Sequence, residues 1–311
     1  MSDSGQAGPE VVVLAGGTGG AKLARGMADV VGAERLAVIA NTGDDIEIYG
    51  AYVSPDPDLV SFWLADEIDE RGWGLRGDSF EVMAALRRLG VDVWFNLGDR
   101  DLAWCLERAR MLAEGLSPTA ALARLNDAIG VRTSVLPMSD DPVRTWVRSG
   151  TAGWSGFQDF MIRGQAAGLV EGLEYRGAEQ AAASAEVLAA IDAARTIVIG
   201  PSNPLASIGP ILAVHGLQAA LLAAAAPVIA VSPIVAGEVL KGPTGAFMAF
   251  AALDLSADGI ADFYGELLDG IVADENVGRL ASLRTDTLMD DAAARARLAE
   301  QTLSFAQGLR G

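Results

Sequence analysis

The stretch Val11-Val12-Val13-Leu14-Ala15-Gly16-Gly17-Thr18-Gly19-Gly20-Ala21-Lys22-Leu23 decides the fold of this chain. Its β-branched run predicts a buried parallel strand, its glycine cluster predicts a tight turn, and its Ala/Leu-rich continuation predicts a helix. Because glycine has no side chain, the backbone N–H groups of such a turn can surround and hydrogen-bond an anion at the positive end of the helix that follows. The first hypothesis is therefore a nucleotide or phosphate site, contacted by Gly16, Gly17, Thr18, Gly19, Gly20 and Lys22.

This turn departs from two named motifs. A Walker A loop requires Gly-Lys-Ser/Thr, whereas Ala21-Lys22-Leu23 stands here, which argues against an ATPase. The dinucleotide fingerprint requires a third glycine where Lys22 lies, and no acidic residue closes a ribose-binding strand after 36–39. Ordinary NAD binding is therefore disfavoured as well. A tight strand-to-helix turn without a ligand stays open, because glycine-rich turns also serve packing alone.

The alternation of strand, polar loop and helix recurs along the 311 residues. Further strands are predicted at 36–40, 91–95, 196–199, 227–231 and 270–273. Helices are predicted at 59–68, 78–89, 258–268 and 291–309, with one more that follows the run 96–101 and ends at about 113, and another that starts at 117–118 and ends at about 129. This pattern predicts an α/β fold with a doubly wound, mostly parallel, Rossmann-like sheet in one domain over 10–311. Short alternating stretches predict a mixed insertion at about 132–177, and the polar residues 1–9 predict a disordered tail.

Composition restricts the function classes. The net charge of −18 argues against binding to nucleic acid or to an anionic membrane, because both need a basic surface. No apolar run reaches membrane-spanning length and the N-terminus has no apolar signal core, so we expect a cytoplasmic protein. The single cysteine, Cys105, is expected to be a buried structural thiol. The single histidine, His215, argues against a Ser-His-Asp apparatus and a His-rich metal site, so any metal is expected on carboxylates.

Polar residues follow several of the predicted strands. The run 41–45 ends in Asp44 and Asp45, which are suitable ligands for a hard cation or a ribose, although Gly-Asp-Asp is also common in turns and helix caps. The run 54–58 is a helix start signal, but capping explains only one of its two aspartates. Because ligands of open α/β sheets bind beyond the carboxyl ends of the strands, these loops are expected to face one crevice.

A series of motifs in this order resembles the CofD/FbiA family, the phospholactate or phosphoenolpyruvate transferases of deazaflavin coenzyme F-420 synthesis. The motifs are Gly16-Gly17-Thr18-Gly19-Gly20-Ala21-Lys22, Gly43-Asp44-Asp45, Ser54-Pro55-Asp56-Pro57-Asp58, Gly72-Trp73-Gly74, Asn96-Leu97-Gly98-Asp99-Arg100-Asp101, Gly200-Pro201-Ser202-Asn203-Pro204 and Ser207-Ile208-Gly209-Pro210. Each motif alone is weak, but their number and order over roughly 11–290 make the resemblance specific.

The resemblance implies a reaction and its site residues. A GDP-linked three-carbon acid would be the donor and the deazaflavin Fo the acceptor; the terminal ribityl hydroxyl of Fo attacks the phosphorus and GMP leaves. The family uses Mg²⁺ and commonly forms homodimers. By position, Asp58 and Arg100 match the catalytic and Fo-binding aspartate and basic residue. The nucleotide would be held by 16–22 together with Gly200, Ser202, Asn203 and Ser207, and the metal candidates are Asp44, Asp45 and Asp58.

Other functions are compatible with the same residues. The chain could be a nucleotide-binding sensor that keeps the crevice without the reaction, or a generic Rossmann-type enzyme acting on a nucleotide sugar or NAD. Within the transferase hypothesis, phospholactate, phosphoenolpyruvate and phosphoglycerate donors differ by a few atoms, and no residue of the sequence chooses among them.

Overall fold

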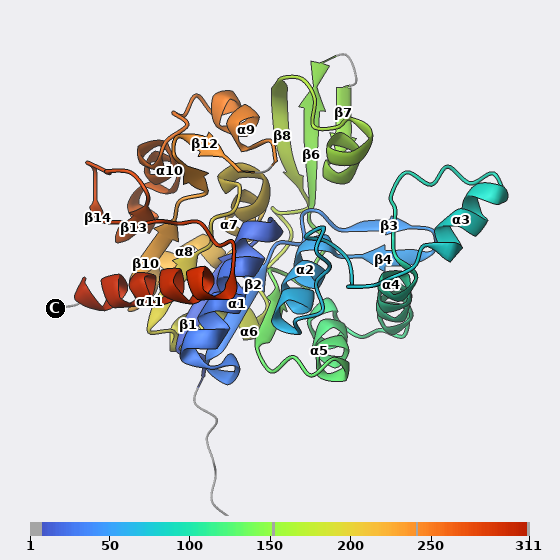
Figure 1. Ribbon diagram of the computed structural model, residues 1–311, viewed down its shortest axis with the longest axis horizontal. Coiled ribbons are helices and arrows are strands. Elements are labelled where there is room, and N and C mark those ends of the chain that lie inside the picture. Colours follow the sequence, from blue (N-terminus) through green and yellow to red (C-terminus); the bar gives the residue numbers. More distant parts are fainter. Residues whose placement is uncertain (1–7, 151–152, 241, 310–311) are drawn as a thin grey trace, which may run out of the picture.

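A computed structural model describes residues 8–150, 153–240 and 242–309 of the chain (Figure 1). The predicted tail, 1–9, lies almost entirely outside these described residues. The centre of the molecule is a seven-stranded sheet in which every paired neighbour is parallel, in the order β14-β13-β10-β9-β1-β2-β5. Its strands are β1 Val11–Ala15, β2 Leu36–Ala40, β5 Ser134–Pro137, β9 Thr196–Ile199, β10 Val228–Val231, β13 Gly270–Ala273 and β14 Ala281–Arg284.

The strand order creates one reversal at the middle of the sheet. The chain moves outward from β1 to β2 and β5, then returns to β9 on the other side of β1 and moves outward again. The carboxyl ends of β1 and β9 therefore flank the switch point, where open α/β sheets bind their ligands. This arrangement confirms the predicted doubly wound fold.

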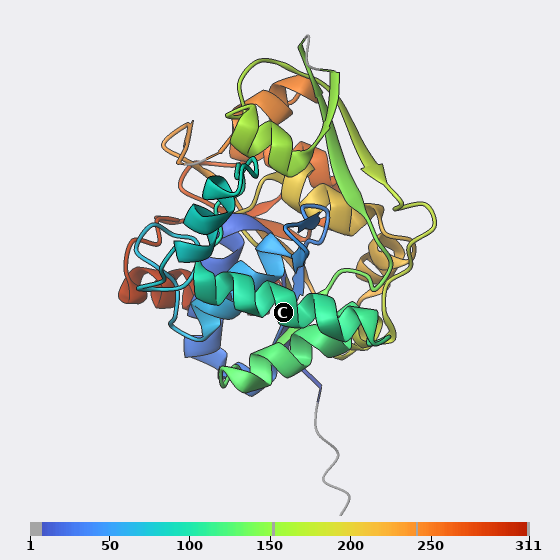
Figure 2. The same cartoon turned by 90° about the vertical axis from the view of Figure 1, so that its right-hand side faces the viewer.

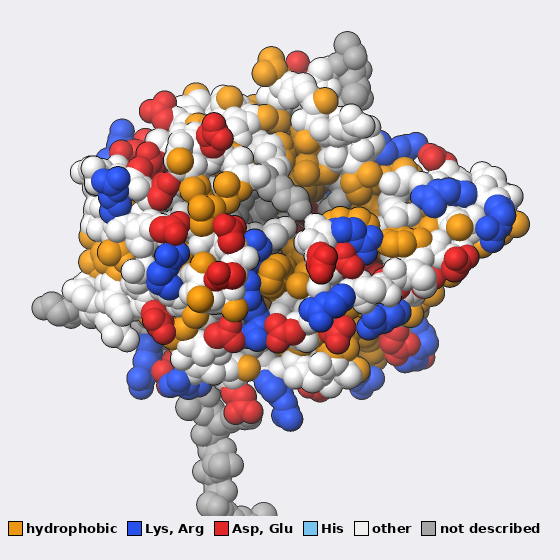
Figure 3. Space-filling model, in the orientation of Figure 1, with side chains coloured by type: hydrophobic (Ala, Val, Ile, Leu, Met, Phe, Trp, Pro, Cys, Tyr) orange, Lys and Arg blue, Asp and Glu red, His pale blue; other side chains and the backbone are white. Residues whose placement is uncertain are grey.

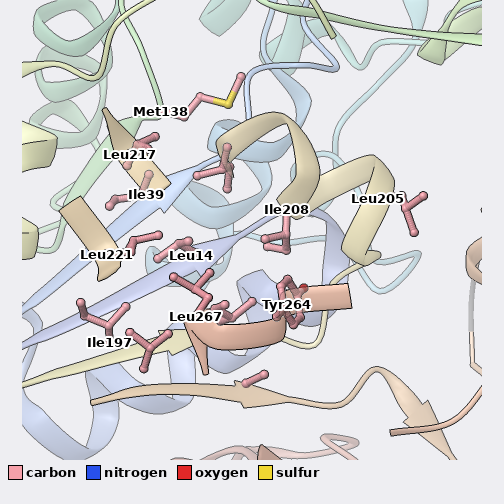
Figure 4. Close-up of a cluster of buried hydrophobic side chains, with 14 of the residues drawn as sticks. Leu14, Ile39, Met138, Ile197, Leu205, Ile208, Leu217, Leu221, Tyr264 and Leu267 are labelled. Atoms are coloured by element: carbon pink, nitrogen blue, oxygen red, sulfur yellow. The ribbon is translucent and has the colours of Figure 1, made fainter. Parts of the chain in front are cut away.

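Alternating side chains of the strands pack against two helical layers. Val11, Val13 and Ala15 of β1 face one layer, and Val12 and Leu14 face the other. The first layer comprises α1 Gly17–Val31, α2 Pro55–Leu64, α4 Asp99–Ala113, α5 Pro118–Ala128 and α11 Ala292–Gly308. The second comprises α6 Ala185–Ala193, α7 Gly209–Ala213, α8 Leu217–Ala223, α9 Thr244–Phe250 and α10 Ala257–Tyr264. Figure 4 shows part of this second core, where Leu14, Ile39 and Ile197 of the sheet meet Leu217 and Leu221 of α8.

Smaller elements surround this sandwich. A hairpin, β3 Ile46–Ile48 and β4 Ala51–Val53, lies next to α4, and α3 Glu81–Arg88 projects beyond it at the right of Figure 1. An antiparallel sheet of β6 Arg144–Ser149, β7 Gly153–Gly156 and β8 Val170–Arg176 stands at the top of Figures 1 and 2. The remaining elements are β11 Ile234–Val235, β12 Glu238–Val239 and the short helical turns Ala33–Arg35, Asp159–Arg163, Pro204–Ile208 and Gly265–Leu267.

In the structure, the segment that stands apart from the central sheet is shorter than the predicted insertion at 132–177. The first part of 132–177 contains β5, which pairs in parallel with β2 and forms one edge of the central sheet. Only β6, β7 and β8, with the turn Asp159–Arg163 between them, make a separate antiparallel unit. The backbone N–H of Thr145 in β6 donates to the carbonyl of Gly43 at 2.7 Å. The insertion is therefore attached beside the loop that follows β2.

The predicted strand at 91–95 is wrong. These residues form an extended connection outside any sheet, Val91 is 40% exposed, and the N–H of Phe95 donates to the Tyr49 hydroxyl. Both edges of β2 are already paired, with β1 and β5, so no position beside it is free. The helix expected at 59–68 begins earlier, at Pro55, because proline suits the first turn. The other predicted strands and helices agree with the structure to within a few residues.

The surface carries charges of both signs. On the face in Figure 3, acidic and basic side chains are interspersed, and several basic ones lie over the projecting part around α3. Within the described ranges, no helix has the length and apolar character needed to cross a membrane.

Candidate active site at the switch point

The glycine turn after β1 is held by side chains from two other segments. The N–H of Gly16 donates to the Ser202 hydroxyl at 3.2 Å, and the N–H of Gly17 donates to the Asp56 carboxylate at 2.7 Å. In the described chain, no side chain accepts from the N–H groups of Thr18 or Gly19, at the start of α1. The turn is thus partly used for internal contacts, and its remaining N–H groups lie at the positive end of a 15-residue helix.

Several glycines here are required by close packing. A Cβ on Gly16 would lie 2.6 Å from the Ser207 Cβ, and a Cβ on Gly19 would lie 2.1 Å from the Pro201 carbonyl oxygen. A Cβ on Gly200 would lie 3.0 Å from the Cα of Gly20. The packing interpretation of the glycine cluster therefore holds for these positions. The same close approach brings the two predicted nucleotide-binding loops together at the switch point.

Gly19→Ala should destabilise the protein by about 1–3 kcal/mol or more, because the carbonyl of Pro201 is backbone and cannot rotate away. Urea denaturation followed by circular dichroism measures this loss. Gly278→Ala is the matched control, since a Cβ there meets nothing within 4 Å and its φ lies outside the left-handed region. Equal stability of Gly19→Ala and wild type would contradict the close contact between the two loops.

Asn41, directly after β2, connects two buried carboxylates. Its Nδ2 donates to Asp44 at 3.1 Å and to Asp56 at 2.9 Å, while its Oδ1 accepts from the N–H of Gly43 at 2.8 Å. Asp44 is 6% exposed and Asp56 is 5% exposed. Burial and the negative charge of Asp56 raise the pKa of Asp44 well above its usual value, and burial also raises the pKa of Asp56. Two carboxyl groups here share one amide donor, and no cationic side chain hydrogen-bonds to either among the described residues.

Asp45 belongs to a second polar group beside the first. Its carboxylate accepts from the Ser54 hydroxyl at 2.7 Å and from the Tyr52 hydroxyl at 2.9 Å. The Tyr52 oxygen accepts in turn from Arg144 of β6 at 3.0 Å. Burial raises the pKa of Asp45 to about 7, although Arg144 and Ser54 act in the opposite direction. A small cavity of about 240 Å³ lies against Asp45, Tyr52, Arg144 and Thr42.

Asp58 faces away from these two groups and contacts α4. Its Oδ1 accepts from the indole Nε1 of Trp104 at 2.7 Å, and Arg108 pairs with both of its oxygens. Asp58 is therefore not a helix cap. The structure does not bring Asp44, Asp45 and Asp58, the predicted metal candidates, together around one point; Asp44 lies with Asp56 instead.

Arg100 and Lys22 lie on the surfaces of α4 and α1, and their predicted roles in Fo and nucleotide binding stay predictions. The Arg100 side chain is 55% exposed, donates to the Arg76 carbonyl at 3.1 Å and lies 3.7 Å from Glu67. The basic residue that contacts Asp58 is Arg108. The Lys22 ammonium lies 5.9 Å from the centre of the Trp63 ring.

Unpartnered polar atoms mark the crevice. Thr42 Oγ1, Thr145 Oγ1 and Asn203 Nδ2 are buried, and none has a hydrogen-bond partner in the described chain. A Cβ on Gly43 would lie 2.4 Å from Thr145 Oγ1 and 3.1 Å from the Pro210 Cβ, so the loop after β2 packs between β6 and the segment that follows β9. The Asn203 Oδ1 is already used by the N–H groups of Leu205 and Ala206. Because buried polar groups are almost always satisfied, these three atoms are available to hydrogen-bond a polar ligand or water in the crevice.

Sequence reasoning missed four contributors to the site: Asn41, Asp56, Arg108 and Arg144. Asp56 stands inside a recognised motif and Asn41 begins the polar run 41–45, so position alone could have found them. Arg108 gives a weaker signal, a charged residue on the face of α4 that also carries the buried Trp104 and Cys105. The expected burial of Cys105 is confirmed.

Comparisons with known proteins identify the family of the chain. The family model described as 2-phospho-L-lactate transferase CofD matches residues 11–298. The chain is 39% identical over 321 residues to a phosphoenolpyruvate transferase of Kitasatospora aureofaciens, covering 96% of this chain and 98% of the relative. It is 36% identical over 301 residues to a 2-phospho-L-lactate transferase of Methanosarcina mazei, covering 93% and 98%.

Among solved structures, a member of the UPF0052 family from Bacillus halodurans superimposes with a TM-score of 0.62 at 16% identity, covering 95% of this chain and 99% of that one. At this identity the likeness concerns the fold alone. The match over 11–298, which contains every strand of the central sheet and all three loops of the crevice, shows that the chain belongs to the CofD family.

Proposed function

We propose that the protein transfers a phospholactate or phosphoenolpyruvate group from its GDP-linked donor to the ribityl hydroxyl of the deazaflavin Fo, in coenzyme F-420 biosynthesis. The observation that carries the proposal is the convergence of the loops after β1, β2 and β9 on one crevice with buried carboxyl groups and unpartnered polar atoms. The relatives support it, because they are named as transferases of these two groups. Both names occur at similar identity, so the acid stays open.

In the proposed reaction the hydroxyl oxygen of Fo forms a bond to the phosphorus that bears the acid. The bond from that phosphorus to the GMP oxygen breaks, GMP leaves with the bonding electron pair, and the hydroxyl proton passes to the Asp58 carboxylate. Transfer of this kind depends mainly on positioning and on neutralising negative charge. The turn after β1 and the loop 200–207 would hold the nucleotide through N–H groups and the Asn203 amide, and Asp58 would orient the acceptor hydroxyl.

We assign the expected Mg²⁺ to Asp44 and Asp56. The donor set suits the ion, because both groups offer carboxylate oxygen, both are buried, and they accept only from the Asn41 amide and the Gly17 N–H. Of the other predicted ligands, Asp45 is used by Tyr52 and Ser54, and Asp58 by Arg108. When bound, Mg²⁺ would neutralise charge on the diphosphate of the donor. We also expect the protein to act as a cytoplasmic homodimer, as the resemblance implies.

The test incubates the purified protein with Mg²⁺, Fo and each GDP-linked acid, and follows the deazaflavin product by mass. A metal-dependent gain of mass on Fo with one donor is the expected result, and it identifies the acid. Asp58→Ala should abolish this product. A protein that binds GDP but forms no product with any donor would contradict the transferase and favour the nucleotide sensor.

A further inference from the structure

Arg108 lies at the centre of a buried polar contact between α2, α4 and β4. The residue is 3% exposed. Its Nη1 donates to Asp58 Oδ2 at 3.0 Å and to the Tyr52 carbonyl at 3.1 Å, and its Nη2 donates to Asp58 Oδ1. Trp104, one turn earlier on α4, donates to the same Oδ1 at 2.7 Å. One guanidinium thus connects Asp58 to the strand that carries Tyr52.

Because of these contacts, Asp58 has few free positions left to accept hydrogen bonds. A carboxylate offers about four acceptor positions, two on each oxygen. Trp104 and Arg108 together use both positions on Oδ1 and one on Oδ2. The remaining position is on Oδ2, and its direction is fixed because the planar fork of Arg108 holds both oxygens in one orientation.

The surroundings of Asp58 are otherwise acidic. Asp58, Asp101 and Cys105 offer ligand atoms that all lie within 4.8 Å of one another, and all three residues are buried. Such a group could be taken for a metal site, but the Arg108 guanidinium already occupies Asp58 and would repel a cation there. Arg108 instead offsets the charge of a carboxylate that would otherwise lie buried beside a second carboxyl group.

We propose that Arg108 is a positioning residue of the transferase, which fixes Asp58 so that its one free acceptor position points at the hydroxyl of the deazaflavin acceptor. The inference rests on the proposed function. Trp104 assists by fixing Oδ1 from the other side. Neither residue needs to touch the substrate; both act through the orientation of Asp58.

The experiment compares Arg108→Met, Arg108→Lys and Trp104→Phe with Arg110→Met. Arg110 is the matched control, since it lies on the same helix, pairs with Glu107 and Glu114, and is 52% exposed. For each variant, kcat, the KM for Fo, and the Kd values for Fo and GDP by calorimetry are measured, together with thermal unfolding.

Arg108→Met is expected to lower kcat/KM for Fo by about 100-fold, because a displacement of about 1 Å at a reacting group has an effect of that size. The Kd for GDP should stay within about threefold of wild type. Arg108→Lys keeps the charge but not the fork, so it should recover part of the loss, and Trp104→Phe should lose less than Arg108→Met. Arg110→Met should behave as wild type.

A purely structural role predicts a different pattern. The Arg108 and Trp104 variants would then unfold at lower temperature, while the folded fraction kept the wild-type kcat/KM and Kd for Fo, and this result would overturn the inference. If Arg108→Met does not fold, Arg108→Lys and Trp104→Phe decide between the same two patterns. Wild-type protein without product and without Fo binding would overturn the proposed function and this inference together, whereas active wild type with unaffected variants overturns this inference alone.

Discussion

Asp56→Asn is expected to lower kcat/KM by about 100-fold or more while the protein remains folded. Asp56 accepts from Gly17 and Asn41, and it forms the proposed Mg²⁺ set with Asp44. Asparagine has nearly the same volume as aspartate but no charge, so only one of the two carboxylates that would hold the ion remains. The NH₂ group of the new side chain would also point at one of the two donors, the Gly17 N–H or the Asn41 amide, which would leave that donor unpaired at a cost of about 1–3 kcal/mol. The turn after β1 and the loop after β2 should both shift as a result.

The measurement is turnover as a function of Mg²⁺ concentration, with direct calorimetric titration of Mg²⁺ alone. The variant should need at least about tenfold more Mg²⁺ for half-maximal activity, because one of two charged ligands is lost. Asp192→Asn on α6 is the control, since that residue is exposed. Full activity of Asp56→Asn with an unchanged Mg²⁺ requirement would place the ion elsewhere and remove Asp56 from the site.

The sheet could be predicted because its signals are local. β1 and β9 are short apolar runs that end at glycine, and each of them is buried on both faces, which is the pattern of a central parallel strand. The run at 91–95 shows the limit of this reasoning. Its residues have the same strand-forming character, but the neighbouring edge is occupied by β5, and that depends on the whole topology.

The site could be located but not assigned residue by residue. The loops 16–20 and 41–45 were expected at one crevice, and the resemblance placed 200–207 with the first of them. Loops 16–20 and 200–207 are in direct contact, and Asp56 connects the glycine turn to Asn41. Asp56 and Asp58 lie two residues apart on the first turns of α2, so their side chains point in different directions. The Asp56 side chain contacts the glycine turn, and the Asp58 side chain contacts α4. The position of α4 in the fold, which the sequence does not show, determines which aspartate makes which contact.

The ion pair between Asp58 and Arg108 was not predicted, because no motif contains Arg108. Arg100, which the resemblance implies for Fo binding, has an exposed side chain beside Glu67, and that role stays a prediction. Arg108 is two helical turns further along α4, on the face buried against α2 and β4. A guanidinium is rarely buried unless it is paired, so its partner becomes visible only when the two helices are placed side by side.

Asp101→Asn is expected to stabilise the protein at pH 8 and to have little effect near pH 4. Asp101 is 8% exposed, and burial, together with the negative charges of Asp58 and Asp78, raises its pKa to about 7. Below about pH 3 the group is protonated in both the folded and the unfolded chain, so it has no influence on stability there. Between about pH 4 and 7 the unfolded chain releases the proton and the folded chain retains it, so stability falls as the pH rises.

The loss is complete above about pH 7 and amounts to at most about 4 kcal/mol, from a difference of about three pKa units. Asparagine resembles the protonated acid and removes this loss. Urea denaturation of both proteins at pH 4.5 and pH 8 measures it, with the exposed Asp127→Asn on α5 as control. A variant that is less stable than wild type by the same amount at both pH values would contradict the raised pKa.

Turnover of the same variant adds the functional half of the argument. Buried carboxyl groups with raised pKa values are concentrated at sites whose chemistry uses them. Asp101 lies beside Asp58, within the group that Arg108 neutralises. We expect Asp101→Asn to be more stable at pH 8 and slower in transfer. That result would show that the carboxyl group lowers stability but supports activity, and that it acts with Asp58 and Arg108 where the acceptor Fo binds.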